Sequence, residues 1–496
     1  MFSTVSNPEL PAYTEVPELD FYLKNGLLFC LYEEKPHACL KENPDTNMLN
    51  ALAHLKGEYP VLQLDEASYN ALKGRFLEVT TEEGIGEVEG FENPEEIENF
   101  LQNVDLLDSE NSAPIIRYVN SLFVQAVKRR ATDIHIETFE RDGDVRFRID
   151  GVLNKIATLK KGAIDSIINR IKVISNLDIS ETRIPQDGRT KITIAGSSVD
   201  VRVSVLPTYY GEKVVMRLLM KGESIPSLHN LGFSVEVYNK LKSLLKHSYG
   251  MILITGPTGS GKSTTLHSFL KEIDHEHFNI VTIENPVEYN APGVNQIQVN
   301  EKVNLTFSEA LRSILRQDPD VIMVGEMRDA ETAKIATQAA MTGHLLLSTL
   351  HTNSAVAAIP RLMDMGIDPF LVRSTLIGVL AQRLVRKLCP YCKVPYAPSE
   401  DDKEYFYLPD DAKVYGPKGC EKCGFTGYKG RRAIGEIILV DDAFGAKIKY
   451  GADEQSLRRY LLEETDFKPM FEELRLMVMT GETSIAEAIR IGVKGV

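Results

Sequence analysis

The spacing of apolar residues changes along the chain, and the change predicts folded regions of different class. Between Ile115 and Val127, apolar residues recur at helical spacing. The segments ATDIHIE and DVRFRID then predict two strands that are joined by a turn around 141–143. A helix from about 163 to 175 and a strand in VDVRVSV follow, so we expect an α+β domain that ends near Gly222.

The strand in VDVRVSV has two faces of opposite character, because successive side chains of a strand point to opposite sides. One face carries only valines, and the other carries polar residues. The valines are Val199, Val201, Val203 and Val205, and the polar residues are Asp200, Arg202 and Ser204. Arg202 therefore lies on the polar face of this strand.

From residue 251 onward, short β-rich runs alternate with helical segments, which is typical of a parallel sheet. We expect strands at 251–255, 279–283, 320–324 and 344–349. A helix should begin near Phe307, with Thr306 and Glu309 placed as a capping box. The pattern predicts a second domain of α/β class.

An acidic stretch separates a small N-terminal unit, residues 1–78, from these domains. Twelve acidic residues and no Lys or Arg lie between Glu78 and Glu110. Such a composition favours a solvated linker over residues 79–111, with at most a short helix near 97–107.

Bulk composition narrows the class of protein. A chain of 496 residues is too long for one core and suggests about three or four domains. Its longest apolar runs fall far short of the roughly 18 residues that a spanning helix needs, and the N-terminus lacks the pattern of a secretory signal. We therefore expect a cytoplasmic protein whose membrane contact is indirect. The net charge of −14 argues against nucleic-acid binding.

The segment GPTGSGKS fits the phosphate-binding pattern GxxxxGK[ST] and lies between a predicted strand and a predicted helix. Backbone N–H groups of such a loop converge on phosphate oxygens at a helix N-terminus. Lys262 would reach the β- and γ-phosphates, and Ser263 would bind Mg²⁺. The candidate nucleotide-binding residues are Gly256, Pro257, Thr258, Gly259, Ser260, Gly261, Lys262, Ser263 and Thr264.

Carboxylates and histidines follow or flank other strands of the same predicted sheet. Glu326 lies just beyond the strand at 320–324, and Glu284 and Glu288 follow the strand at 279–283. Ligands of α/β sheets bind at such strand ends, so we expect Glu326 to position water or Mg²⁺. His344 and His351 flank the strand LLLSTL. Each could be structural, but because both bracket a strand of this sheet we favour γ-phosphate sensing or coupling.

Four of the six cysteines form two CxxC pairs, Cys389 with Cys392 and Cys420 with Cys423, separated by 27 residues. Each pair can offer two thiolates to one ion, and four thiolates suit tetrahedral Zn²⁺. A redox site would need only one pair. We therefore predict a structural zinc site that supports the folding of its own loop.

Taken together, these motifs resemble the type II secretion and type IV pilus assembly ATPases of the secretion ATPase superfamily. The resemblance rests on GPTGSGKST, TIENPVE, LRQDPDVIMVGEMRD and TGHLLLSTLHTN in this order. It extends to ATDIHIE, PQDGR and RVSVLPTYYGEKVVMRLL upstream and to AQRLVRKLCPYC and CEKCGFTGYKGRRAIGE downstream. It covers about residues 112–440.

The resemblance implies an α/β fold with a RecA-like P-loop ATPase core and a preceding PAS-like α+β domain. The implied parts are the α+β domain at 112–225, the ATPase core at 226–388, a four-cysteine zinc module at 389–433 and a C-terminal helical subdomain at 434–496. It further implies ATP, Mg²⁺ and Zn²⁺ as cofactors and a homo-hexameric ring that powers protein secretion or pilus assembly at a bacterial inner membrane. Retraction-type relatives lack the cysteine module.

The resemblance also gives roles to individual residues. Glu284 and Glu288 match the family's aspartate box, and Glu326 matches its Walker B motif. His344 and His351 match the histidine box. Arg202 and Arg217 match arginines that contact nucleotide phosphates from the α+β domain, where they would neutralise charge in the transition state.

Asn285 stands where the family usually has Asp. An amide can still form hydrogen bonds but adds no charge near Mg²⁺. This departure leaves open a nucleotide-gated scaffold that does not hydrolyse ATP. A nucleic-acid translocase is a further alternative, which the acidic net charge disfavours.

The N-terminal unit carries no recognised motif. Some relatives sense cyclic di-GMP with this part of the chain, but here no arginine precedes Arg75, and such ligands are usually held by arginine. We therefore expect residues 1–78 to dock a protein of the inner-membrane platform.

Overall fold

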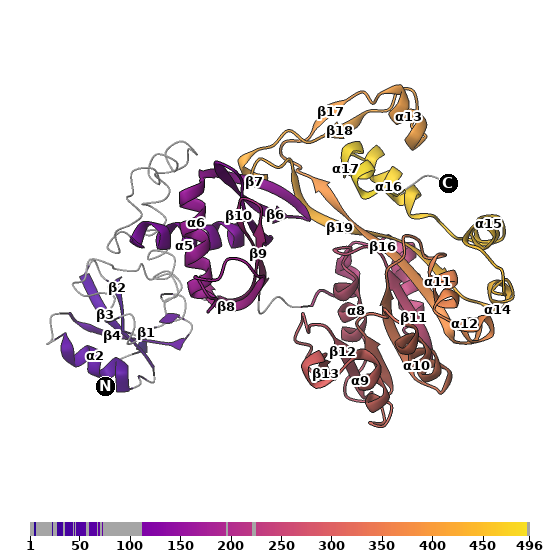
Figure 1. The fold of residues 1–496 in the computed structure, drawn as a ribbon, viewed down its shortest axis with the longest axis horizontal. Coiled ribbons are helices and arrows are strands. Elements are labelled where there is room, and N and C mark those ends of the chain that lie inside the picture. The colour runs from indigo at the N-terminus through magenta and orange to yellow at the C-terminus, as the bar shows by residue number, and fades with distance from the viewer. Residues whose placement is uncertain are drawn as a thin grey trace. The chain divides into compact units, whose positions relative to one another are not determined.

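The computed structural model describes residues 112–194, 197–220 and 225–493, together with short pieces within the first 72 residues. The chain forms two compact units, Met1–Gly222 and Glu223–Val496 (Figure 1). The acidic linker predicted at 79–111 and the short helix near 97–107 lie outside the described residues. Among the residues described, no helix combines the length and the apolar character needed to cross a membrane.

The N-terminal part of the first unit contains a four-stranded sheet in the order β1-β4-β3-β2. Its elements are β1 (Thr4–Val5), β2 (Leu28–Tyr32), β3 (Lys35–Lys41), α2 (Thr46–His54) and β4 (Val61–Leu64). Phe29, Leu64 and Leu72 are fully or almost fully buried in a core of its own. This part is therefore a folded element in its own right.

The remainder of the first unit is a six-stranded antiparallel sheet in the order β7-β6-β5-β10-β9-β8, packed against two helices. The elements are α5 (Ser112–Lys128), β5 (Ala131–Thr138), β6 (Asp142–Ile149), β7 (Val152–Lys160), α6 (Lys161–Ile174), β8 (Gln186–Ile194), β9 (Ser197–Thr208) and β10 (Gly211–Met220). The predicted helices and strands are confirmed. The four valines of β9 are buried, as their alternation indicated.

The second unit is built on a seven-stranded sheet in the order β13-β12-β14-β15-β11-β16-β19, in which only β19 is antiparallel to its neighbour. The strands are β11 (Gly250–Thr255), β12 (Ile280–Glu284), β13 (Asn295–Gln298), β14 (Val321–Val324), β15 (Leu345–Leu350), β16 (Leu376–Leu388) and β19 (Tyr428–Leu439). The four predicted strands are β11, β12, β14 and β15, each confirmed to within a residue.

Helices cover both faces of this sheet. One face packs against α7 (Val235–Leu244) and α8 (Lys262–Lys271). The other packs against α9 (Phe307–Ile314), α10 (Ala330–Met341), α11 (Ala358–Asp364) and α12 (Pro369–Thr375). Because alternate residues of β11 face opposite layers, Ile252 belongs to the first core and Leu253 to the second.

The predicted capping box of α9 is half confirmed. Thr306 Oγ1 accepts the N–H of Glu309 at 3.3 Å, so the N-cap forms. The Glu309 carboxylate accepts a hydrogen bond from Arg312 at 2.8 Å and forms an ion pair with it. The carboxylate is therefore paired along the helix instead of completing the box.

The remaining elements lie between and after the two long strands, and Figure 1 shows them beside β16 and β19. They are β17 (Val394–Tyr396), α13 (Glu400–Phe406), β18 (Val414–Gly416), the short 3₁₀ turn η4 (Glu421–Cys423), α14 (Asp442–Gly445), α15 (Glu454–Glu464), α16 (Met470–Met479) and α17 (Ile485–Ile491). Two further 3₁₀ turns, η2 (Leu228–Leu231) and η3 (Glu301–Val303), lie earlier in the same unit. β17 pairs with β18 only. The segment 389–427 is thus an insertion between two paired strands of the sheet.

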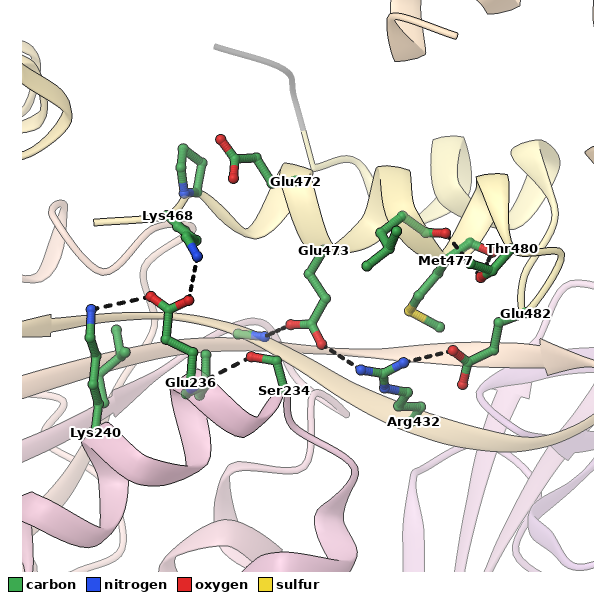
Figure 2. A pocket seen from close by; sticks show the side chains of 15 residues that line it. Ser234, Glu236, Lys240, Arg432, Lys468, Glu472, Glu473, Met477, Thr480 and Glu482 are labelled. Carbon is green, nitrogen blue, oxygen red and sulfur yellow. Dashed lines mark hydrogen bonds and ion pairs between the residues drawn. The ribbon is translucent and has the colours of Figure 1, made fainter. Parts of the chain in front are cut away.

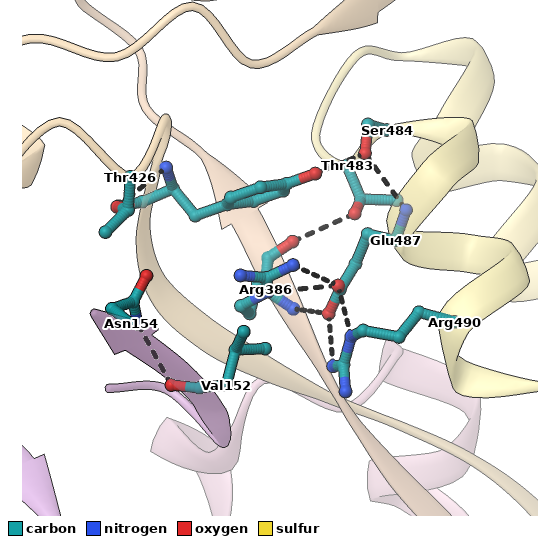
Figure 3. Close-up of polar contacts among 9 residues, drawn as sticks. Val152, Asn154, Arg386, Thr426, Thr483, Ser484, Glu487 and Arg490 are labelled. Carbon is teal, nitrogen blue, oxygen red and sulfur yellow. Dashed lines mark hydrogen bonds and ion pairs between the residues drawn. The ribbon is translucent and has the colours of Figure 1, made fainter. Parts of the chain in front are cut away.

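A buried carboxylate fastens α17 to β16. Glu487 is completely buried and accepts two hydrogen bonds from the Arg386 guanidinium and one from its backbone N–H (Figure 3). Arg490 donates two more, at 2.7 Å each. Arg386 also lies 3.9 Å from the ring centre of Tyr428 on β19. Since a buried charge must be paired to be tolerated, this cluster fixes the C-terminal helix against the sheet.

We expect Glu487→Ala to lower the free energy of unfolding of the second unit by about 3 kcal/mol, because it leaves the Arg386 guanidinium buried without a carboxylate. Arg490→Ala is the matched control and should cost less than about 1 kcal/mol, because Arg490 is partly exposed and Glu487 keeps its bonds to Arg386. Urea denaturation of the full chain, followed by near-UV circular dichroism, measures both. Equal losses would contradict the role given to Arg386.

Candidate active site

The segment 256–261 joins β11 to α8 in a conformation that requires glycine. Gly256, Gly259 and Gly261 have φ of 151°, 78° and 87°. A Cβ on Gly256 would lie 2.6 Å from the carbonyl oxygen of Gln382 and from Ser260 Oγ. No side chain caps α8 at Gly261, so the first N–H groups of the helix are left for a ligand. This geometry confirms the predicted strand, loop and helix.

Lys262 occupies the inside of the loop. Its Nζ donates to the carbonyl oxygens of Gly256 at 2.8 Å and Pro257 at 3.2 Å. Burial lowers the pKa of Lys262 to about 8, with Glu326 opposing the shift and Arg383 adding to it. Ser260 Oγ is buried and has no hydrogen-bond partner within the described chain. A cation and a free hydroxyl beside the uncapped start of a helix fit a phosphate group.

The carboxyl ends of β11, β14 and β15 bring Glu326 and His351 to the edge where the loop lies. The strands are in register, with Thr255 opposite Leu350 and Val324 opposite Ser348. Glu326 forms an ion pair with Arg328 at 2.7 Å, and its other oxygen is 3.6 Å from His351 Nε2. The structure therefore brings Glu326 and His351 together, and Glu326 acts on the charge of Lys262.

Glu284 ends β12 at the same edge but is buried and already well partnered. It accepts hydrogen bonds from Thr282 at 2.9 Å and Gln296 at 3.0 Å. His267 Nε2 lies 3.3 Å from Glu284 Oε2, close enough for an ion pair although it is not aligned for a hydrogen bond. Glu288, in contrast, is exposed. Of the two predicted acids, Glu284 is thus held in place and Glu288 is free to move.

His267 is a residue of this site that the sequence analysis missed. Its Nδ1 lies 2.9 Å from the carbonyl oxygen of Ser263, one turn earlier in α8. Burial lowers the pKa of His267, but the Glu284 carboxylate outweighs burial, and the net shift is upward. The ring thus links the helix of the phosphate loop to the end of β12. Thr264 is linked to the same region, because its hydroxyl is 3.0 Å from Tyr289 Oη.

The two histidines that flank β15 lie at opposite ends of it. The strand has six residues, so at about 3.3 Å per residue its ends are about 20 Å apart. His351 lies at the edge of the phosphate loop, whereas the Nδ1 of His344 is 2.9 Å from the carbonyl oxygen of Ala339 near the end of α10. His344 and His351 therefore cannot both contact one phosphate.

Two buried residues of β16 support the loop and were not identified from the sequence. Gln382 donates from Nε2 to the carbonyl oxygen of Ser260 at 2.7 Å. Arg383 donates to the carbonyl oxygen of Asn353, just after His351, at 3.1 Å. Burial lowers the pKa of Arg383. β16 thus braces both the phosphate loop and the segment that follows β15.

Arg202 and Arg217 lie side by side in the first unit, on one face of its antiparallel sheet. Arg202 is opposite Arg217 on one side and opposite Arg189 on the other. Arg217 Nε donates to Asp133 Oδ1 at 2.9 Å, and Arg148 is 3.5 Å from the same carboxylate. Like charges opposite each other destabilise a sheet, so this row of four arginines and one aspartate is suited to an anion. Arg189 and Arg148 were not singled out from the sequence.

The four cysteines of the insertion form one cluster. The Sγ atoms of Cys389 and Cys420 are 3.9 Å apart, as are those of Cys392 and Cys423, and all four lie within 4.8 Å of one another. Tetrahedral zinc with Zn–S bonds of about 2.3 Å requires sulfurs about 3.8 Å apart. Cys423 Sγ accepts the N–H groups of Cys420 and Gly427, and these outweigh burial and lower its pKa to about 7. The donor set and its spacing fit one zinc ion.

Comparison with known proteins agrees with these features. Residues 108–490 match the family model described as "Type II/IV secretion system protein". The chain is 50% identical over 400 residues to the type II secretion system ATPase E of Vibrio cholerae, covering 79% of this chain and 78% of that protein. It is 40% identical over 498 residues to a type II secretion system protein E of Pseudomonas aeruginosa, covering 98% and 99% of the two chains.

Among solved structures, the ATPase DotB of Legionella pneumophila has a similar fold, with a TM-score of 0.56 and 21% identity. The similarity covers 75% of this chain and 95% of that one. The DotB of Yersinia pseudotuberculosis gives a TM-score of 0.54 at 20% identity. The family match, the relatives and the geometry of the phosphate loop lead to one conclusion: the chain belongs to the type II/IV secretion system protein family and is an ATPase.

Proposed function

We propose that this ATPase works as a homo-hexameric ring and powers protein secretion or pilus assembly at a bacterial inner membrane. The observation that carries the proposal is the convergence of the phosphate loop, Glu326 and His351 at one edge of the parallel sheet. The relatives named type II secretion ATPases support secretion as the work performed. The absence of a strongly basic composition disfavours a nucleic-acid translocase.

The residues at the carboxyl edge of the sheet would have different roles in ATP hydrolysis. The loop 256–264 would bind ATP, with Lys262 on the β- and γ-phosphates and Ser263 on Mg²⁺. Glu326 would orient the attacking water, because it is only slightly exposed and has one oxygen facing His351. His351 would sense the γ-phosphate through its contact with Glu326. When Mg²⁺ is bound, it neutralises charge on the phosphates.

Glu284 and Glu288 would act differently. Glu284 is fixed by Thr282, Gln296 and His267, so we assign it a positioning role. Glu288 is the exposed acid of this turn and remains available to Mg²⁺ or water. His344, at the far end of β15, would couple nucleotide state to another surface of the same unit. Asn285 is exposed and adds no charge, so these two glutamates supply the acid groups of the turn.

Arg202 and Arg217 would contact the nucleotide phosphates when the α+β domain, PAS-like in class, closes over a nucleotide site in the ring. The row of arginines on one face of its sheet supports this role. The zinc module at 389–433 would be structural. Residues 1–78 would dock a platform protein of the inner membrane, so the ATPase would be cytoplasmic and peripheral to that membrane, with no direct membrane contact.

Glu326→Gln should leave nucleotide binding intact and lower turnover by about a hundredfold or more, since it removes the group that orients water. Lys262→Ala should abolish both binding and turnover. Steady-state ATP hydrolysis and equilibrium binding of labelled ATP measure the two effects. Glu404→Gln, on the exposed face of α13, is the control and should resemble wild type. Near-normal turnover of the Glu326 variant would show that Glu326 has no catalytic role.

Arg202→Ala and Arg217→Ala should lower turnover at least about a thousandfold while changing nucleotide affinity of the subunit little, because an arginine of this kind acts in the transition state. Arg183→Ala removes an exposed arginine of the same unit, paired only with Glu181 at 2.7 Å, and should have no effect. The ratio of kcat to binding affinity distinguishes the variants. Equal losses of affinity and rate would argue against closure over the phosphates.

The purified protein should contain about one zinc ion per chain. Cys392→Ser should remove the metal and disorder the segment 389–427, while the phosphate loop still binds nucleotide. Elemental analysis measures the metal, and proteolysis of the insertion measures its order. Protein prepared under reducing conditions that holds no zinc would refute a zinc site.

A further inference from the structure

A groove on the second unit lies away from the phosphate loop, between α7, β19 and α16 (Figure 2). Its volume is about 410 Å³. Val237, Ile437 and Met477 give it an apolar floor, and Leu476 is 59% exposed on its wall. A groove of this size takes a few side chains but not the surface of a folded domain.

The cations at the α7 end of the groove are already paired. Glu236 accepts ion pairs from Lys468 at 2.5 Å and from Lys240 at 3.5 Å. Lys240 also contacts Asp466 at 2.9 Å. These pairs connect α7 to the segment before α16 and leave no excess of positive charge at this end.

The other end of the groove has more carboxylates than cations. The Arg432 guanidinium is shared between Glu473 at 2.7 Å and Glu482 at 2.6 Å, as Figure 2 shows. Burial raises the pKa of Glu473 even though Arg432 opposes the shift, and Glu482 contributes to the rise. Glu472 is exposed at the mouth. Two carboxylates thus share one guanidinium, with Glu472 a third acid on the Lys468 side of the mouth, and one more positive charge would be accommodated.

We propose that this groove is a docking site for a partner protein that inserts a short apolar segment bearing Lys or Arg. The cation would enter past Glu472 at the mouth and lie beside Glu473 and Glu482, and the apolar side chains would pack on Val237, Leu476 and Met477. The excess of carboxylates over cations at this end attracts a positive charge, and burying the exposed Leu476 against the apolar floor is favourable. The same carboxylates repel phosphate groups, which disfavours a nucleic acid or an anionic lipid headgroup as the occupant.

The groove also touches the segment that leads from the first unit into α7. Arg432 Nε donates to the carbonyl oxygen of Gly232 at 2.7 Å, and Ser234 caps α7 by accepting the N–H of Val237 at 3.3 Å. An occupant that draws Glu473 away from Arg432 therefore acts on the group that holds Gly232. A partner bound in this groove would therefore act on the segment that precedes α7.

The probe is a short fluorescein-labelled peptide of Leu and Lys that carries one benzoylphenylalanine. Anisotropy on the full chain, without nucleotide, should show saturable binding, and photocrosslinks mapped by mass spectrometry should fall within residues 468–482. Glu472→Lys and Leu476→Asp each change an exposed side chain, so the fold should be kept. Each should weaken binding about tenfold. A peptide with Glu in place of Lys should not bind.

Glu301→Lys is the matched control, because it makes the same charge change at an exposed residue next to β13, the opposite edge strand of the sheet. It should bind the peptide as wild type does. The proposal is overturned if Glu472→Lys and Glu301→Lys behave alike, if Leu476→Asp binds normally, or if crosslinks lie mainly outside the groove. Equal binding of the Lys and Glu peptides would also overturn it. None of these readouts depends on ATP hydrolysis, so they are independent of the proposed function.

Discussion

The organisation of the second unit depends on the backbone N–H groups at the start of α8, which no side chain caps at Gly261 and which lie at the carboxyl edge of a parallel sheet. Such groups attract an anion, and their positions are set by the chain geometry. β11 is completely buried between two layers of helices, so the loop that follows it cannot shift without disturbing both cores. Gly256 allows the close approach of Gln382, and Gln382 fixes Ser260 from the neighbouring strand. Glu326 and His351, at the ends of neighbouring strands, are placed relative to this loop.

Strand β16 connects the phosphate loop to the rest of the second unit. Within thirteen residues it contacts the phosphate loop through Gln382, holds α17 through Arg386 and leads into Cys389 of the four-cysteine cluster. Its long antiparallel pairing with β19 returns the chain to the sheet after the cysteine insertion. The cysteine insertion and the C-terminal helices are therefore connected by continuous sheet to the edge where the phosphate loop lies. A shift of β16 would move both of them.

Patterns within single segments of the sequence predicted the individual strands and their buried faces. Alternation in VDVRVSV identified the buried valines, and short β-rich runs identified β11, β12, β14 and β15. β16 was not identified because it is covered on both faces almost throughout and therefore lacks a regular alternation, and β19 pairs with it only after an insertion. His267 lies on α8 beyond the phosphate-binding motif, and its contact with Glu284 exists only after α8 packs beside β12. The row from Arg189 to Arg148 likewise arises from strand register, and the groove arises from three elements that are far apart in sequence.

The central claim is that the segment 256–264 receives the phosphates of ATP, and the position of Lys262 in a structure with bound Mg²⁺ and a non-hydrolysable ATP analogue tests it most directly. In the structure, Lys262 Nζ donates to the carbonyl oxygens of Gly256 and Pro257. The account predicts that Nζ leaves these carbonyls for the β- and γ-phosphates, with Ser260 Oγ also within hydrogen-bond distance of the phosphates. A structure in which Nζ stays on the carbonyl oxygens while the phosphates lie elsewhere would contradict it.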